Sequence, residues 1–227
     1  MASRNRALAS ANNLANLNTP GYRAQEANTA TGPQGRGAAV DSISFNTLEG
    51  SLISTGNPTD LAIQGPGYFT VADGNGNPSY TRDGSFRLSA NGTLVNSQGL
   101  TLQPPIAIPR DATAVNIGSD GAVHVQLPGG RTANVGQVQL AHFSNPQGLI
   151  RTGGNLLAPT GASGVAQTGA PGTGGLGVLQ SGFLESSNVD IAQEMIQLRL
   201  EENITRANVA VARTGDEMTR TAIDLLG

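Results

Sequence analysis

The two histidines of the chain, His124 and His142, are the first candidates for proton transfer near neutral pH or for metal binding. Each lies in an alternating, strand-like pattern with no other ligand at metal-site spacing, and metal sites need clustered ligands. Members of a Ser-His-Asp triad need not be neighbours in sequence, but no serine occupies a Gly-x-Ser-x-Gly elbow. We therefore interpret both histidines as ordinary strand residues.

Two further motifs have the outline of ligand-binding loops but lack the residues that bind. Asp73-x-Asn75-x-Asn77 has calcium-loop spacing, yet Pro78 replaces the turn glycine and Gly84 replaces the bidentate glutamate. The glycine cluster at 172–177 has no strand before it and opens no helix, so it does not support phosphate binding. The sequence predicts no enzyme, no catalytic or metal-ligating residue, no cofactor and no small-molecule substrate.

Composition excludes several other classes of protein. Aromatic residues make up 4% of the 227, while 31 glycines and 12 prolines favour many short strands and turns over a deep aromatic pocket. The net charge is −3 and no basic run occurs, which argues against nucleic-acid binding. The absence of cysteine rules out disulfides and thiol chemistry. The polar segment 1–18 lacks the apolar centre of a Sec signal, so we expect export, if any, without signal cleavage.

The stretch from Asp41 to about Phe143 reads as a series of short strands. Hairpin-turn residues punctuate it at 73–77, 90–92 and 119–121. The expected strands are 42–45, 60–63, 68–72, 85–88, 115–117, 123–126 and 135–142, with a last one at 179–184. Such spacing predicts a body of the β-sandwich or barrel-like type.

A long helix is expected from Val189 to Leu226, with Ser187 as N-cap and Asp190 three residues further on. It would be about 57 Å long. Its apolar residues recur at three- and four-residue steps, and Thr214 and Thr221 occupy the two remaining seam positions. One interpretation is a core helix folded back on its own domain; the one we favour is an assembly helix whose seam needs a partner.

A second, shorter helix is expected from Ala2 to Asn16, ended by Pro20 and Gly21. A helix of that length is marginal alone, so we expect the two terminal helices to pair as a coiled coil. The predicted assembly interface lies on both helices, and we expect it to pack between them and against neighbouring copies. It consists of small and apolar seam residues: Leu8, Ala11, Leu14, Leu200, Ile204, Ala207, Val211, Met218 and Leu225.

The expected fold class is therefore mainly β, with a helical module built from both termini. The expected division is 1–23 for the N-terminal helix and signature, 24–40 for a linker poor in large apolar residues, 41–185 for the β-rich domain, with an internal boundary near 144–178, and 186–227 for the assembly helix.

Three stretches together resemble the bacterial flagellar rod and hook proteins. The segments 65–69 (GPGYF) and 80–86 (YTRDGSF) are similar to the start of that family's β region, and 182–190 (GFLESSNVD) resembles the opening of its C-terminal helix. The N-terminal signature consists of Asn12, Asn13, Leu14, Ala15, Asn16, Thr19, Pro20, Gly21 and Tyr22. Among family members the distal rod is most similar. Two departures stand out: 24–40 is shorter than usual, and 198–208 lacks an aromatic motif.

The resemblance implies a tubular homopolymer that carries motor torque across the periplasm and envelope within the flagellar basal body. The implied partners are further copies of the chain, other rod and hook proteins, envelope ring proteins and the flagellar type III export machinery. Two alternatives remain: a proximal rod subunit, because of the short 24–40 segment, and a secreted β-rich glycan-binding module. The second is poorly supplied with aromatic platforms, since the chain has no Trp and three Tyr.

Overall fold

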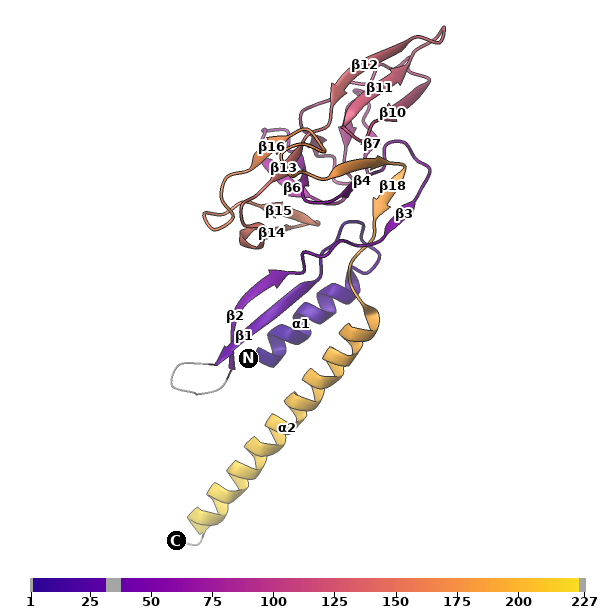
Figure 1. The fold of residues 1–227 in the computed structure, drawn as a ribbon. Coiled ribbons are helices and arrows are strands. Elements are labelled where there is room, and N and C mark those ends of the chain that lie inside the picture. The colour runs from indigo at the N-terminus through magenta and orange to yellow at the C-terminus, as the bar shows by residue number, and fades with distance from the viewer. Residues whose placement is uncertain (1, 32–37, 225–227) are drawn as a thin grey trace. The chain divides into compact units, whose positions relative to one another are not determined.

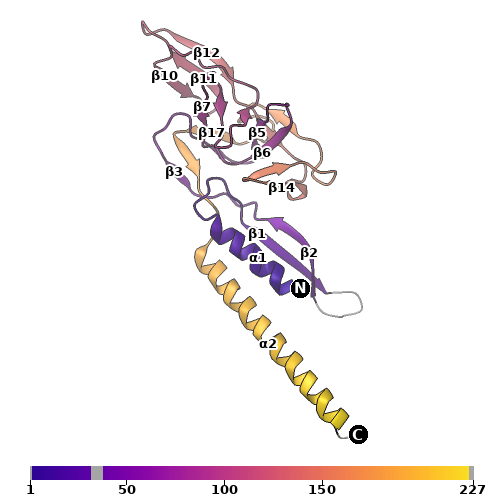
Figure 2. The same cartoon turned by 180° about the vertical axis from the view of Figure 1, so that it is seen from behind.

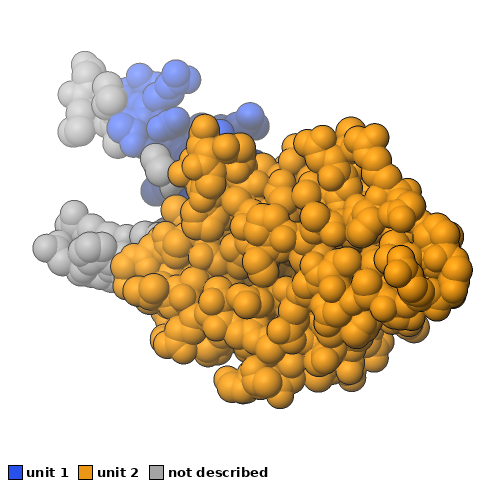
Figure 3. Space-filling view, turned by 90° about the horizontal axis from the view of Figure 1, so that it is seen from above, with its two compact units in different colours: residues 1–17, 24–46, 189–227 blue, residues 18–23, 47–188 orange. Residues whose placement is uncertain are grey.

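The computed structural model describes residues 2–31 and 38–224 (Figure 1). The chain divides into two compact units, coloured separately in Figure 3. The helical unit comprises Met1–Leu17, Ala24–Asn46 and Val189–Gly227, and the β unit comprises Asn18–Arg23 and Thr47–Asn188. No helix within the described residues is long and apolar enough to cross a membrane.

The helical unit contains α1 (Ala2–Ala15), β1 (Gln25–Thr31), β2 (Ala38–Phe45) and α2 (Ile191–Asp224). Helix α1 lies beside the N-terminal turns of α2 and against β1 (Figures 1 and 2). The side-chain bonds between the two helices are polar. Arg6 pairs with Glu201 at 2.7 Å, and the Asn13 amide donates to Glu194 Oε1 at 2.7 Å.

The first turn of α2 is capped by Asp190, so the prediction of Ser187 as N-cap was wrong. Asp190 Oδ1 accepts the backbone N–H groups of Ala192 at 2.8 Å and Gln193 at 3.2 Å. A carboxylate there satisfies free N–H donors and faces the positive end of the helix dipole. The helix then runs for 34 residues, or about 51 Å, which agrees closely with the expected span.

The expected linker at 24–40 is instead a hairpin over most of its described part. Strands β1 and β2 pair antiparallel from Gln25 opposite Phe45 to Thr31 opposite Ala38, with a bulge between Asn28 and Thr29; residues 32–37 of the expected linker lie outside the described residues. Strand β1, with the sequence QEANTAT, has no large apolar residue and therefore no hydrophobic signal of its own. Its pairing with β2 and its packing on α1 make it a strand.

The β unit consists of short strands around one apolar core. In chain order they are β3 (Leu52–Ser54), β4 (Leu61–Gln64), β5 (Tyr68–Ala72), β6 (Pro78–Thr81), β7 (Arg87–Leu88), β8 (Leu94–Val95), β9 (Thr101–Leu102), β10 (Ala114–Ile117), β11 (Ala122–Gln126), β12 (Thr132–Gln137), β13 (Leu140–His142), β14 (Ile150–Gly153), β15 (Leu156–Ala158), β16 (Gln167–Gly169), β17 (Val178–Ser181) and β18 (Phe183–Glu185).

The largest sheet runs β14-β15-β6-β5-β9-β8-β7, with β13 pairing both β5 and β16. A second sheet has the order β10-β11-β12, and two ribbons pair β17 with β4 and β18 with β3. The described strands form no closed barrel, so the barrel-like part of the expectation was wrong. The mainly β class with one helix near each terminus is confirmed.

Two expected strands are each divided in two. Residues 135–142 split into the end of β12 and β13, and residues 179–184 split into β17 and β18. The second break falls at Gly182, which has φ +82° and donates its N–H to the Asp60 carbonyl at 2.8 Å. Because this backbone conformation suits glycine, the chain leaves the β17 ladder there.

The predicted turns at 73–77, 90–92 and 119–121 lie between β5 and β6, β7 and β8, and β10 and β11. In the first, Asp73 Oδ1 accepts the N–H groups of Asn75 and Asn77, each at 2.9 Å. The Asn77 side-chain amide also donates to Asp73 Oδ2 at 2.9 Å, and this bond, followed by the backbone bonds, lowers the pKa of Asp73. The motif with calcium-loop spacing is thus a hairpin turn closed by its own aspartate.

The core of the β unit is formed mainly by aliphatic side chains around Phe69 and Phe86, whose rings meet edge to face at 5.1 Å. His124 is exposed on β11 and His142 is half-buried on β13, so both are strand residues as predicted. No group of three potential metal ligands occurs among the described residues.

Thr70 on β5 offers a test of polar burial in this sheet. Its Oγ1 is buried without a hydrogen-bond partner in the described structure. Thr70→Val keeps the shape and removes the unpaired hydroxyl, so we expect the free energy of unfolding to rise by about 1 kcal/mol in urea titrations. The control is Thr81→Val. The Thr81 hydroxyl donates to the Asn155 carbonyl at 3.0 Å, so its removal should lower the free energy of unfolding. If both variants shift stability in the same direction, hydroxyl pairing is not the cause.

Candidate functional site

Arg82, directly after β6, lies at the centre of a buried polar cluster in the β unit. Its side chain is 4% exposed, and its guanidinium meets Glu185 Oε2 twice, through Nε at 2.9 Å and through Nη2 at 2.8 Å. The remaining N–H groups donate to the backbone carbonyls of Ile63 at 2.9 Å and of Gly65 and Gly67 at 2.8 Å. One arginine therefore holds three points of the 63–67 turn and the end of β18.

Glu185 joins the same cluster from β18 and is 1% exposed. Its Oε1 meets Arg23 at 2.8 Å and accepts the N–H of Gly50 at 3.0 Å. Glu49 completes the set, since its Oε1 lies 3.4 Å from Arg82 Nη2. We call Arg23, Glu49, Arg82 and Glu185 the signature cluster. With two arginines and two glutamates, its formal charges balance.

Burial sets the electrostatics of the cluster. Desolvation lowers the pKa of Arg23, and the charge of Glu185 opposes that shift. Burial likewise raises the pKa of the neighbouring Tyr68 phenol. The polar contacts of the cluster hold separate segments of the β unit together.

The N-terminal signature loop, residues 19–23, contacts the cluster through Gly21. The Gly21 N–H donates to the Glu185 carbonyl at 2.8 Å. Its φ is +64°, and a Cβ built there would lie 2.4 Å from the Arg82 carbonyl carbon and 2.6 Å from the Asp83 nitrogen. Only glycine fits both the backbone conformation and the close approach.

The residues on either side of Gly21 are held as well. Asn155 Nδ2 donates to the Pro20 carbonyl at 2.9 Å. The buried Tyr22 ring carries the Arg151 guanidinium 4.2 Å from its centroid, a cation–π contact. Arg151 also donates to the Arg23 carbonyl. Residues 20–23 are thereby each held by contacts within the β unit.

The cluster lies where the chain enters and leaves the β unit. The chain passes between the units after residues 17, 23, 46 and 188. Arg23 and Glu49 stand next to two of these points, and Asn188 at a third donates its N–H to the Tyr22 carbonyl at 3.3 Å and its amide to the Leu48 carbonyl at 2.7 Å. Within the β unit, these entry segments are therefore bonded to one another.

The predicted seam residues are exposed. Leu8 is 52% exposed and Leu200, Ile204, Val211 and Met218 are between 40% and 72% exposed. Leu14, Ala11 and Ala207 are exposed too, and Leu225 lies outside the described residues. Helix α1 instead buries a face with Ala9, Ser10 and Asn13. Packing of the predicted seam as a coiled coil, or against neighbouring copies, stays a prediction.

The signature residues serve different purposes. Asn13 is 1% exposed and exchanges bonds with the Gln25 backbone, donating to its carbonyl at 2.9 Å and accepting its N–H at 2.7 Å. Asn12, Leu14 and Ala15 are exposed, and the Asn16 amide donates to the Asn12 carbonyl at the end of α1. Thr19 accepts the Tyr22 N–H at 3.2 Å and closes the turn.

Sequence reasoning missed all four cluster residues. Two of them, Arg82 and Glu185, lie inside the motifs that carry the family resemblance. A charged residue in the middle of a glycine- and aromatic-rich motif is a signal for a buried pair, because burial of a charge requires a partner. Their separation of 103 residues hides the pairing from any local pattern.

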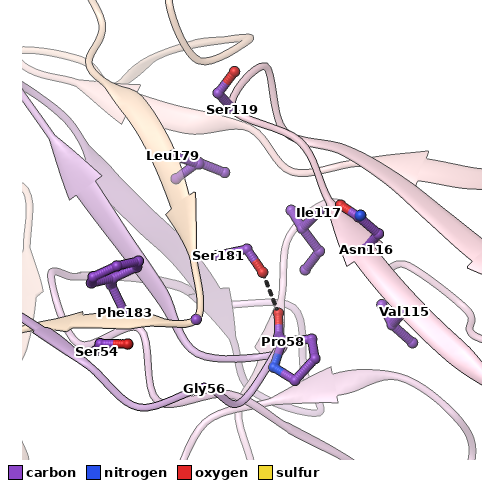
Figure 4. A pocket seen from close by; sticks show the side chains of 11 residues that line it. Ser54, Gly56, Pro58, Val115, Asn116, Ile117, Ser119, Leu179, Ser181 and Phe183 are labelled. Atoms are coloured by element: carbon purple, nitrogen blue, oxygen red, sulfur yellow. Dashed lines mark hydrogen bonds between the residues drawn. The ribbon is translucent and has the colours of Figure 1, made fainter.

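A groove of about 580 Å³ in the β unit offers no reactive arrangement. It lies between β3, β10 and β17, where Ser181 Oγ donates to the Pro58 carbonyl at 2.8 Å (Figure 4). Its lining contains no titratable side chain and a single aromatic ring, Phe183. An acid–base or sugar-stacking role therefore has no support there.

The chain combines a long helix with an exposed apolar seam and a β unit whose buried charged side chains pair with other parts of the chain. These features are those of a structural assembly protein. The chain belongs to the flagellar basal-body rod family. The family model "Flagellar hook protein FlgE/F/G D1 domain" matches residues 62–125, and "Flagellar basal body rod FlgEFG protein C-terminal" matches residues 180–225. The resemblance found in the sequence motifs is confirmed.

Relatives align over nearly the whole chain. The flagellar basal-body rod protein FlgG of Caulobacter vibrioides is 36% identical over 94% of this chain and 91% of its own length. FlgG of Bacillus subtilis is 35% identical over 94% of this chain and 90% of its own length. The flagellar basal-body rod protein FlgF of Rhizobium meliloti is 35% identical over 96% of this chain and 90% of its own length.

Proposed function

We propose that the chain is a structural subunit of the distal flagellar rod, whose copies polymerise into a tubular drive shaft that transmits motor torque through the cell envelope to the hook. The observation that carries the proposal is the open seam of α2. The likeness to FlgG proteins supports the rod assignment.

The energetics of α2 favour a partner. Beyond Glu201, α2 is exposed at residues 202–221 and at Asp224. Helices gain most of their stability from packing an apolar face, and propensity alone contributes little. Covering a Leu, Ile, Val or Met contributes about 1.5–3 kcal/mol each. Several such side chains per copy therefore favour association between copies.

The same proposal names the surroundings of the polymer. The partners are further copies of the chain, other rod and hook proteins, the envelope rings around the shaft and the flagellar type III export machinery. The site of action is the basal body across the periplasm. The chain acts by packing and force transmission, with no catalytic step and no cofactor.

Two substitutions on the seam test the proposal. Leu200→Asp with Val211→Asp places two charges on the face that copies must bury, so polymerisation should be abolished while urea unfolding of the β unit stays unchanged. The measurement is sedimentation and electron microscopy of purified protein. Thr205→Asp, an exposed change off the seam of α2, is the control and should polymerise. If the double variant polymerises at the concentration at which the wild type polymerises, the proposal is wrong.

A further inference from the structure

Helix α2 carries four arginines at seven-residue intervals: Arg199, Arg206, Arg213 and Arg220. Seven residues complete almost two helical turns, so these side chains form one row, about 32 Å long. All four are exposed, and the side chains of Arg199 and Arg206 are 80% and 75% exposed. We call them the arginine row.

Two acidic rows follow the same repeat. Glu202 and Asp216 are separated by fourteen residues, and Glu217 and Asp224 by seven. With about 100° of rotation per residue, the first row lies about 60° to one side of the arginine row and the second about 40° to the other. All four carboxylate side chains are exposed. The positive and negative rows on this helix therefore repeat at the same seven-residue interval.

Pairing within the helix uses only part of this charge. Glu202 meets Arg206 at 2.6 Å and Arg199 at 3.5 Å. Arg213 and Arg220 form no ion pair with any described residue, although Asp216 and Glu217 lie within one turn of both. Within the helical unit, α1 lies beside only the N-terminal turns of α2 (Figures 1 and 2). The C-terminal half of the arginine row therefore faces solvent in the single chain.

We propose that the arginine row of α2 docks against an acidic row on α2 of a neighbouring copy. The inference rests on the proposed polymer. A parallel copy displaced by four residues, about 6 Å along the axis, brings Arg213 level with Glu217 and Arg220 level with Asp224. Each further step of seven residues offers another aligned register, because the rows share one repeat.

The contact is heterologous, since one copy contributes cations and the next contributes anions. Contacts of that kind build rings and helical filaments and do not stop at dimers. Charges across an interface select partner and register more than they add affinity. The apolar seam thus holds copies together, while the arginine row decides which axial offset they adopt.

Charge reversal and its restoration test the docking. The variants are Arg213→Glu with Arg220→Glu, and Glu217→Arg with Asp224→Arg, in the full chain. Each alone should raise the critical concentration for polymerisation by at least about tenfold at low ionic strength, because like charges then face each other. An equal mixture of the two should polymerise near the wild-type concentration, since opposite charges meet again.

The matched control is Arg87→Glu with Arg131→Glu, which changes the net charge by the same amount at exposed sites of the β unit. It should polymerise as the wild type does. A second variant, Arg213→Gln with Arg220→Gln, avoids like-charge pairs within the helix and should raise the critical concentration by a smaller factor. Far-UV circular dichroism reports whether α2 stays helical in each variant.

The outcomes separate the docking from the polymer itself. Wild-type polymerisation at the same concentration by either reversed variant overturns the docking, and so does failure of the mixture or of the β-unit control. If the wild type forms no polymer, the proposed function fails instead. Restoration in the mixture alone establishes that the two rows meet.

Discussion

Replacing Glu185 with alanine should lower the free energy of unfolding of the β unit by about 3–5 kcal/mol, the loss typical of a buried ion pair deprived of one partner. Arg23 and Arg82 would stay buried without their shared carboxylate. The N–H of Gly50 would also lose its acceptor. Domains are stable by only about 5–15 kcal/mol, so a large share of the stability is at risk. Urea unfolding followed by tyrosine fluorescence measures the change.

The control for this experiment is Glu202→Ala. Glu202 also meets two arginines, but its side chain is 44% exposed on α2. Surface pairs contribute about 0–1 kcal/mol, so this variant should leave the unfolding curve of the β unit unchanged. A double-mutant cycle with Arg82→Met then measures the coupling of Arg82 to Glu185. If Glu185→Ala unfolds like the wild type, the signature cluster does not stabilise the β unit.

Replacing Gly21 with alanine should displace the signature loop from the β unit. Alanine at φ +64° costs about 1–2 kcal/mol by itself. The added Cβ would also lie 2.4 Å from backbone atoms of Arg82, which cannot give way as a flexible side chain could. We expect a total loss above about 3 kcal/mol, in the range of strained backbone sites, together with new proteolytic cleavage within residues 18–23.

The matched control for Gly21 is Gly56→Ala. Gly56 has a similar φ of +70° but nothing within 4 Å of a built Cβ. It should therefore show only the conformational cost, about 1–2 kcal/mol. The difference between the two variants measures the close approach to Arg82. Equal losses would mean that the loop is not held against Arg82 as the structure shows.

The signature cluster suits a shaft subunit for a mechanical reason. The segments through which the chain enters and leaves the β unit are bonded to one another there. We therefore expect tension along the segments at residues 23, 46 and 188 to be shared by Arg82, Glu185 and the Gly21 loop. A weakened cluster should therefore lower the torque that the polymer can transmit before it reduces polymerisation, because the seam of α2 is unchanged.

Local sequence pattern was enough for the turns and for the two helices. Asp73 closes its own hairpin, and the turns at 90–92 and 119–121 contain glycines with positive φ. Both helices lie close to their expected spans because the absence of proline and the apolar repeat act within a few residues. The family motifs, which are contiguous in sequence, were also sufficient to identify the rod family.

Tertiary structure alone decided the rest, because the energies involved join residues far apart in the chain. The polar segment Gln25–Thr31 became a strand only by pairing with β2 and packing on α1. Arg82 and Glu185 are tolerated inside the β unit because they pair with each other across 103 residues and find their remaining partners in other distant segments. A pattern within a short window encodes turn geometry and helical period, while the partner of a buried charge is chosen by the fold.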